Sequence, residues 1–155
     1  MTSRWQALAL LFSVRMAMAF QFQAIAALSP LIMRDFNTDI ADIGLLIGLY
    51  LSPGIVLAFP GGAIGKRFGD KPAVLFGLVL MICGGTFVAL SSDWSVQIGG
   101  RLVAGIGGVI LNVLMSKMVT DWFAGREIAT AMGIFVNSWP VGIALALVEI
   151  GRAHV

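Results

Sequence analysis

The stretch Gly62-Ala-Ile-Gly-Lys-Arg-Phe-Gly-Asp-Lys71 decides the fold of this chain, because it joins two long apolar segments through a short basic turn. The segments are Ile43–Gly65 and Ala73–Leu90. A helix needs about 20 apolar residues to cross a hydrocarbon core about 30 Å thick, and both segments approach that length. Short loops rich in Lys and Arg stay on the cytoplasmic side of a membrane. The stretch therefore predicts two membrane helices joined by a cytoplasmic loop.

The composition of the whole chain agrees with this prediction. Of its 155 residues, 59% are hydrophobic and only 12% are charged, whereas soluble domains carry about 25% charged residues. The net charge is only +2, and the basic residues stand at segment ends rather than in a patch. This distribution excludes nucleic acid as a partner and indicates a lipid bilayer instead.

Five segments have the length and apolarity of membrane-spanning helices. In lipid every backbone polar group must be satisfied internally, and the alternating pattern of a barrel strand is absent, so the segments are predicted to be helices. The predicted fold class is an all-α, polytopic membrane helix bundle. The five predicted helices are Trp5–Met33, Ile43–Gly65, Ala73–Leu90, Val96–Val119 and Ala129–Val148.

The basic residues beside these segments alternate by side. This asymmetry predicts a multi-pass protein of the cell membrane, inner or plasma, with a cytoplasmic N-terminus. Only Arg34 falls on the opposite side. The basic residues on the predicted cytoplasmic side are Arg4, Lys66, Arg67, Lys71, Lys117 and Arg126.

No set of residues suited to catalysis is present. The one cysteine, Cys83, lies within an apolar segment, and the one histidine, His154, is next to the end of the chain. There is no cluster of His, Cys and carboxylate residues and no phosphate-cradling loop. We therefore expect no enzyme, no cofactor and no metal site.

The basic turn resembles the signature loop of the major facilitator superfamily, which closes the cytoplasmic gate in that family. Lys66 stands where the family has an acid, and Asp70 stands where it has a base. The resemblance implies that Asp70 supplies the missing acid one helical turn later, pairing with Arg126 or Lys117. The positions that match the family pattern are Gly62, Arg67, Gly69 and Lys71.

A second resemblance lies in the fourth segment, where Arg101 precedes Gly105, Gly107 and Gly108. The family uses this pattern for proton transfer or substrate handling. Helical spacing puts Arg101, Gly105, Gly108 and Asn112 on one face. An arginine that faces lipid costs about 2.5–3.5 kcal/mol on insertion scales, so this face is predicted to point into the bundle. The alternative is that Arg101 lies near the outer interface and reaches it by snorkelling.

Arg15 and Gln23 in the first segment are further candidates for substrate or coupling contacts. For Arg15 the alternative is a role as an interfacial anchor. In the second segment, Gly44 and Gly48 have the spacing that lets membrane helices pack closely.

Asn137 in the fifth segment is a candidate of the same kind, and it lies close to Pro140 and Gly142. Antiporters of the family often carry a glycine-proline motif here. Trp139 replaces its first glycine and the following double glycine is absent, which disfavours drug efflux.

The last seven residues, Glu149–Val155, resemble the translation of a sequencing adapter rather than a membrane helix. The genuine sequence is then expected to end near Val148. On this interpretation residues 1–148 are part of the N-terminal half of a major facilitator permease, and residues 149–155 are a non-native tail.

The resemblance implies a fragment of a secondary transporter that moves a small solute by alternating access, together with a proton or another coupling ion. An organic or inorganic anion is the first choice of substrate, because two arginines lie at membrane depth. The alternatives are a drug or metabolite efflux pump and a five-helix accessory membrane protein without transport activity.

Overall fold

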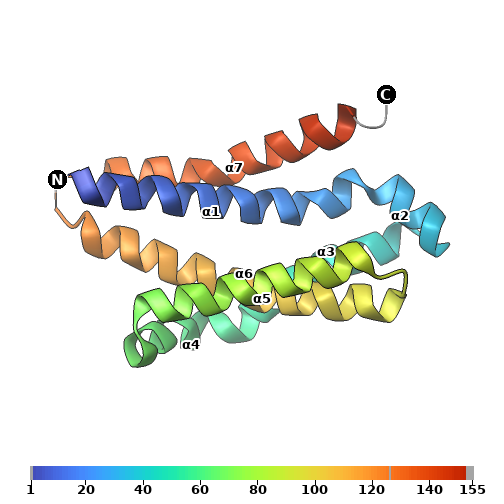
Figure 1. Ribbon diagram of the computed structural model, residues 1–155, viewed down its shortest axis with the longest axis horizontal. Helices are drawn as coiled ribbons and strands as arrows, with labels where there is room; N and C mark the ends of the chain where they lie inside the picture. The colour runs from blue at the N-terminus through green and yellow to red at the C-terminus, as the bar shows by residue number, and fades with distance from the viewer. Residues whose placement is uncertain (1, 126, 153–155) are drawn as a thin grey trace. The chain divides into compact units, whose positions relative to one another are not determined.

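The computed structural model describes residues 2–125 and 127–152, and these residues form helices joined by short turns, with no strand (Figure 1). The side-chain surroundings of residues 2, 3, 58–64, 66, 151 and 152 lie outside the description. The helices are α1 (Thr2–Ala27), α2 (Ser29–Phe36), α3 (Ile40–Leu51), α4 (Pro53–Phe68), α5 (Asp70–Leu90), α6 (Trp94–Trp122) and α7 (Ile128–Arg152).

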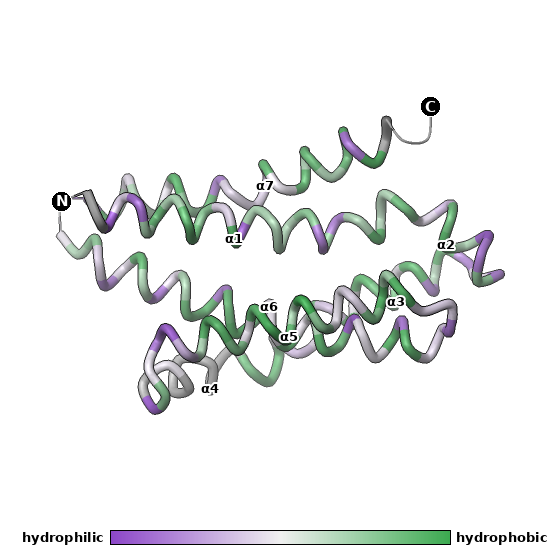
Figure 2. Tube along the Cα trace, in the orientation of Figure 1, coloured by the Kyte–Doolittle hydropathy of each residue, from purple (hydrophilic) through white to green (hydrophobic). Residues whose placement is uncertain are grey.

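Five helical segments in the described residues are long and apolar enough to cross a membrane, which confirms the predicted all-α membrane fold. Figure 2 shows hydrophobic residues along the length of each of them. The segments are Arg4–Ala27, Ile40–Leu57, Asp70–Leu90, Trp94–Trp122 and Ile128–Ile150.

The chain divides into two compact units. The described parts of Met1–Ala27 and Met115–Val155 make up unit 1, and Leu28–Leu114 makes up unit 2. Unit 1 therefore holds α1, α7 and the end of α6, whereas unit 2 holds α2 to α5 and most of α6.

The first two predicted segments are each divided in the structure. α1 ends at Ala27 and α2 begins at Ser29, with a proline in its first turn. α3 ends at Leu51 and α4 begins at Pro53, although Ser52 between them keeps a helical backbone with φ −58° and ψ −36°. Proline lacks a backbone N–H and is preorganised for the first helical position, which accounts for both divisions.

The signature stretch is a tighter turn than the loop of residues 66–72 predicted from the sequence. α4 continues to Phe68 and α5 begins at Asp70, so Gly69 alone is non-helical. Its φ of +88° is a conformation that side chains disfavour, which explains the glycine. A Cβ on Gly65 would lie 2.5 Å from Leu114 Cδ2 and 2.7 Å from Asp70 Oδ1, so the end of α4 is closely packed.

The connection between α2 and α3 is also shorter than predicted. Asn37 ends α2 in the left-handed conformation with φ 50°. Asp39 then caps α3: its Oδ1 accepts hydrogen bonds from the backbone N–H of Ala41 at 2.8 Å and of Asp42 at 3.1 Å, and Asp42 returns a carboxylate to the Asp39 N–H. This reciprocal capping box starts the helix at Ile40.

α7 continues through Pro140 and Glu149 to Arg152. The non-native origin of residues 149–155 stays a prediction, and residues 153–155 of that tail lie outside the described residues.

Candidate functional site

Arg101 is buried inside unit 2. It lies on α6, about 10 Å from the start of the helix at a rise of 1.5 Å per residue, and only 2% of it is exposed. Its Cζ atom lies 5.3 Å from the centre of the Tyr50 ring on α3, within the range of a cation–π contact. Tyr50 is itself only 4% exposed. The guanidinium therefore lies against an aromatic ring in the interior of this unit.

Two glycines of the Arg101 motif make room for Tyr50, Gly108 for its ring and Gly105 for its backbone. A Cβ on Gly108 would lie 2.7 Å from the Tyr50 hydroxyl oxygen and 3.1 Å from its Cζ, and a Cβ on Gly105 would overlap the Tyr50 carbonyl. Arg101, Gly105 and Gly108 thus face α3 together. Asn112, which was predicted to share this face, is exposed.

The opposite contacts of α6 are also made by small residues. A Cβ on Gly84 of α5 would lie 2.5 Å from the backbone N of Ala104 and from the carbonyl of Gly100. Gly77 of α5 and Gly107 of α6 approach each other in the same way. Glycines thus pack α6 closely against α3 and α5, which restricts where Arg101 can lie.

Arg15 is half-buried inside unit 1, where it contacts two aromatic rings of α7. Its Cζ lies 4.5 Å from the centre of the Phe135 ring and 5.9 Å from that of Trp139. The Trp139 ring in turn contacts Phe22 of α1, with centres 5.7 Å apart. The Nε of Arg15 is buried and has no hydrogen-bond partner within the described residues. Two aromatic rings of α7 therefore lie against this guanidinium.

Close helix packing holds α1 against α7 at this level. A Cβ on Gly142 would lie 2.7 Å from the Ala19 Cβ and would overlap the carbonyl of Met16. Gly142 thus has a packing role between α1 and α7. Asn137 is exposed, and its side-chain amide donates a 2.8 Å hydrogen bond to the carbonyl of Gly133 one turn earlier. Gln23 on α1 is half-buried.

An ion pair and ring contacts join the start of α1 to the segment that precedes α7. Arg4 Nη2 lies 2.7 Å from Glu127 Oε2, and the Arg4 guanidinium lies 5.5 Å from the centre of the Phe123 ring. Trp5 packs edge-to-face on the same ring at 4.9 Å. These contacts fix one end of unit 1.

The predicted gate residues lie around the Gly69 turn. Arg67, Gly69 and Lys71 are exposed and Asp70 is half-buried. The side chain of Lys66 and the surroundings of Gly62 lie outside the description.

The predicted pairing of Asp70 with Lys117 or Arg126 stays a prediction. Lys117 forms an ion pair of 3.0 Å with Asp121 one turn later, and Arg126 lies outside the described residues.

Gly44 and Gly48 are exposed, and a Cβ on either would meet no atom within 4 Å. The packing role predicted for this pair stays a prediction.

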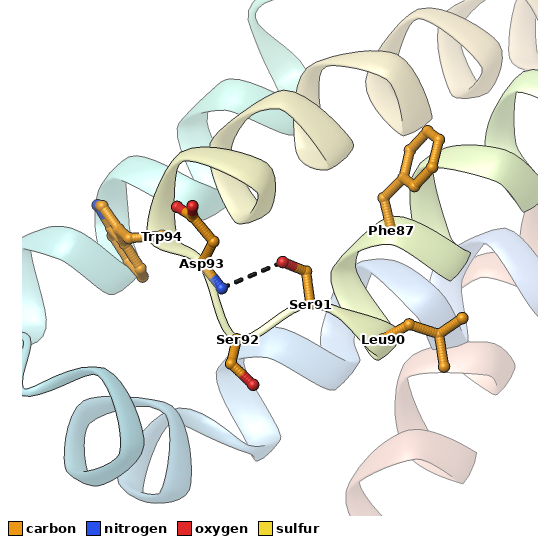
Figure 3. Close-up of a pocket in the computed structure, with 6 residues that line it drawn as sticks. All are labelled: Phe87, Leu90, Ser91, Ser92, Asp93 and Trp94. Atoms are coloured by element: carbon orange, nitrogen blue, oxygen red, sulfur yellow. Dashed lines mark hydrogen bonds between the residues drawn. The ribbon is translucent and has the colours of Figure 1, made fainter.

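A hollow of about 720 Å³ opens at the turn between α5 and α6 (Figure 3), but it contains none of the candidate residues. The polar groups at its rim shape the turn. The Ser91 hydroxyl accepts a 3.1 Å hydrogen bond from the N–H of Asp93, and the Asp93 carboxylate accepts one of 2.8 Å from the N–H of Ser95. Gln97 donates from its amide to the Ser91 carbonyl at 2.8 Å. These are capping interactions of a helix start.

The fold defines a multi-pass, α-helical membrane protein with buried or half-buried arginines inside its helical units. A family model described as "Major Facilitator Superfamily" matches residues 11–150. The chain belongs to this superfamily.

Similar proteins come from animals, bacteria and fungi. The chain is 30% identical over 134 residues to "Lysosomal dipeptide transporter MFSD1" of Danio rerio, covering 83% of this chain and 29% of that protein. It is 24% identical over 123 residues to "Hexuronate transporter" of Bacillus subtilis (strain 168), covering 79% and 29%. It is 26% identical over 127 residues to an "MFS-type transporter" of Aspergillus terreus, covering 82% and 23%. The chain thus spans less than a third of the length of these relatives.

The contacts of the two arginines with Tyr50, Phe135 and Trp139 were not predicted from the sequence. One signal was available: Tyr50 is the only tyrosine in the chain, and it lies within an apolar segment.

Proposed function

We propose that this chain is the N-terminal part of a secondary transporter that moves a small solute carrying a carboxylate by alternating access of two halves. The observation that carries the proposal is an arginine at membrane depth in each unit, with Arg101 against the Tyr50 ring and Arg15 against the rings of Phe135 and Trp139. No Asp or Glu occurs within the first four segments predicted to span the membrane.

The energetics leave room for an anion at these arginines. A desolvated cation–π contact contributes about 2 kcal/mol, whereas an arginine at membrane depth costs about 2.5–3.5 kcal/mol on insertion scales and more in simulations. A cation–π contact alone is therefore smaller than the cost of placing an arginine at membrane depth. An anion that binds beside a guanidinium supplies further stabilisation, which favours binding.

Carboxylate is the anion that fits best. A guanidinium presents a planar fork of N–H donors that matches a carboxylate in a bidentate arrangement. The names of two relatives refer to hexuronates and to dipeptides, and both compound classes carry a carboxylate. A proton or another ion would accompany the solute as the coupling partner.

Purified full-length protein in liposomes tests this proposal. We expect uptake of radiolabelled glucuronate or alanyl-alanine, and we expect Arg101→Gln to abolish most of it. Arg34→Gln is the matched control, because Arg34 is exposed on α2 and should leave uptake unchanged. Uptake of inorganic phosphate in place of both organic probes would move the substrate class to inorganic anions.

Two results would contradict the proposal. Export of a cationic dye with no response to Arg101→Gln would indicate drug efflux, and no transport of any probe by well-folded full-length protein would indicate an accessory protein.

We also propose that the N-terminus and the Gly69 turn face the cytoplasm, on the six-to-one split of basic residues described above. Single cysteines in a Cys83→Ala background test this orientation at two exposed turn positions, Ser92 and Ala124. An impermeant maleimide added to intact cells should modify Ser92→Cys and not Ala124→Cys. The reverse pattern would invert the topology.

A further inference from the structure

We propose that Tyr50 is a positioning residue for Arg101, that Gly108 makes room for its ring, and that Gly105 lets the Tyr50 backbone approach α6 closely. The proposal rests on the proposed function, since it concerns how the substrate arginine of that function is held. Tyr50 would act through Arg101 rather than by touching the substrate.

The first support is the contact itself. Both side chains are almost completely buried, at 4% and 2% exposed, and the guanidinium carbon lies 5.3 Å from the ring centre. The five N–H donors of a guanidinium form one rigid fork. A ring that limits where this group lies therefore also limits the directions in which it can donate to a carboxylate.

The second support is that α6 leaves room for Tyr50, with Gly108 facing the ring and Gly105 facing the Tyr50 backbone. A Cβ on Gly108 would come within 2.7 Å of the Tyr50 hydroxyl oxygen, and one on Gly105 would overlap the Tyr50 carbonyl. Any other residue at either position would displace the ring or its helix. The arginine and both glycines lie on one helical face, at spacings of four and three residues. The spacing of the motif thus places the arginine and the ring it contacts side by side.

A purely structural role for Tyr50 is the competing explanation, and the two differ in what they require. Packing needs only a buried side chain of suitable volume, whereas positioning needs the face of an aromatic ring. Tyr50→Phe keeps the aromatic face. Tyr50→Leu keeps a buried apolar side chain but has no aromatic face. Leu46→Val is the matched packing control, because Leu46 is fully buried on the same helix one turn earlier.

The position of Arg101 can be read without any substrate. Purified full-length protein is treated with phenylglyoxal, which modifies accessible arginines, and the modification of Arg101 is quantified by peptide mass spectrometry. We expect Tyr50→Leu to raise the rate of modification at least fivefold, whereas Tyr50→Phe and Leu46→Val stay within twofold of the wild type. Equal protection in Tyr50→Leu and wild type would overturn the proposal.

A pair of substitutions tests whether Gly108 makes room for the Tyr50 ring, and this test does not depend on the folding of Tyr50→Leu. Gly108→Ala should expose Arg101 to the reagent, because the added methyl meets the tyrosine hydroxyl. Tyr50→Phe removes that oxygen, so the double variant should recover most of the protection. Gly99→Ala on the same helix is the control, since its Cβ meets no atom within 4 Å. If the double variant does not recover protection of Arg101, the role assigned to Gly108 in making room for the Tyr50 ring is contradicted.

Glucuronate uptake then separates this proposal from the function on which it rests. If the wild type transports glucuronate, Tyr50→Leu should raise KM severalfold with little change in maximal rate, and Tyr50→Phe should not. If the wild type does not transport glucuronate but the variants show the expected phenylglyoxal modification of Arg101, the proposed substrate is contradicted and the positioning role of Tyr50 is supported. Unchanged KM in Tyr50→Leu, in a wild type that transports glucuronate, would contradict the positioning role.

Discussion

Arg101 in unit 2 and Arg15 in unit 1 both place a charged side chain within an apolar helix, where charge is costly, but their surroundings differ. Arg101 is fully buried beside the Tyr50 ring, on a helix that glycines pack tightly on two sides. Arg15 is half-buried and contacts two rings of α7, one of which is in contact with α1 as well. The comparison indicates that the two arginines differ mainly in their burial, since Arg101 is almost completely enclosed and Arg15 only half-buried. We therefore expect Arg101 to be the more sensitive of the two.

The largest effect should separate the two arginines directly. In the full-length protein we expect Arg101→Gln to lower the uptake efficiency for an organic anion about 100-fold and Arg15→Gln about tenfold, a difference of about 1.4 kcal/mol. We expect the larger loss at Arg101 because water can take over part of the role of the half-buried Arg15 side chain but cannot reach the buried position of Arg101. The uptake efficiency of each variant is measured from the concentration dependence of uptake in liposomes. Equal losses in the two variants would contradict the expected difference between Arg101 and Arg15.

Glycine substitutions should show a smaller but clear effect on stability. Gly105→Leu and Gly142→Leu each force a side chain into a neighbouring backbone, and such overpacking typically costs about 1–3 kcal/mol. Gly44→Leu is the control, because a Cβ there meets no atom within 4 Å. Thermal unfolding in detergent should show lower midpoints for the first two variants only. A tolerated Gly105→Leu would mean that α3 does not depend on close approach to α6.

Loss of a ring beside Arg15 should have a modest effect. We expect Trp139→Leu to reduce uptake about threefold, because Phe135 remains against the guanidinium and a partial cation–π loss is about 0.5–1 kcal/mol. Trp5→Leu in the same unit is a control, since that ring packs on Phe123 rather than on Arg15. If both variants behave alike, the ring at 139 acts through general packing.

The smallest effect should come from the ion pair at the end of unit 1. Arg4 and Glu127 are about one-third exposed, at 35% and 39%, and pairs of this kind contribute only about 0–1 kcal/mol. Glu127→Gln should therefore change the unfolding midpoint by a few degrees at most, and salt should reduce the difference. A large loss would show that the pair supports the ring contacts of Phe123.

The sequence predicted the all-α membrane class because hydropathy and segment length are properties of local composition. It also placed Arg101, Gly105 and Gly108 on one helical face, because helical periodicity is regular. It did not predict the aromatic partners: Tyr50 and Arg101 are far apart in the chain, and only tertiary packing brings them together. The loop predicted at residues 66–72 is longer than the observed turn. Hydropathy shows where the apolar residues end, but the backbone stays helical through the polar residues on either side of Gly69.

That one-residue turn has a consequence for how the folded protein can move. One residue spans at most about 3.6 Å, so the end of α4 and the start of α5 lie within a few ångströms of each other. A movement of either helix as a rigid body therefore carries the adjoining end of the other helix with it. A residue inserted beside Gly69 would weaken this coupling.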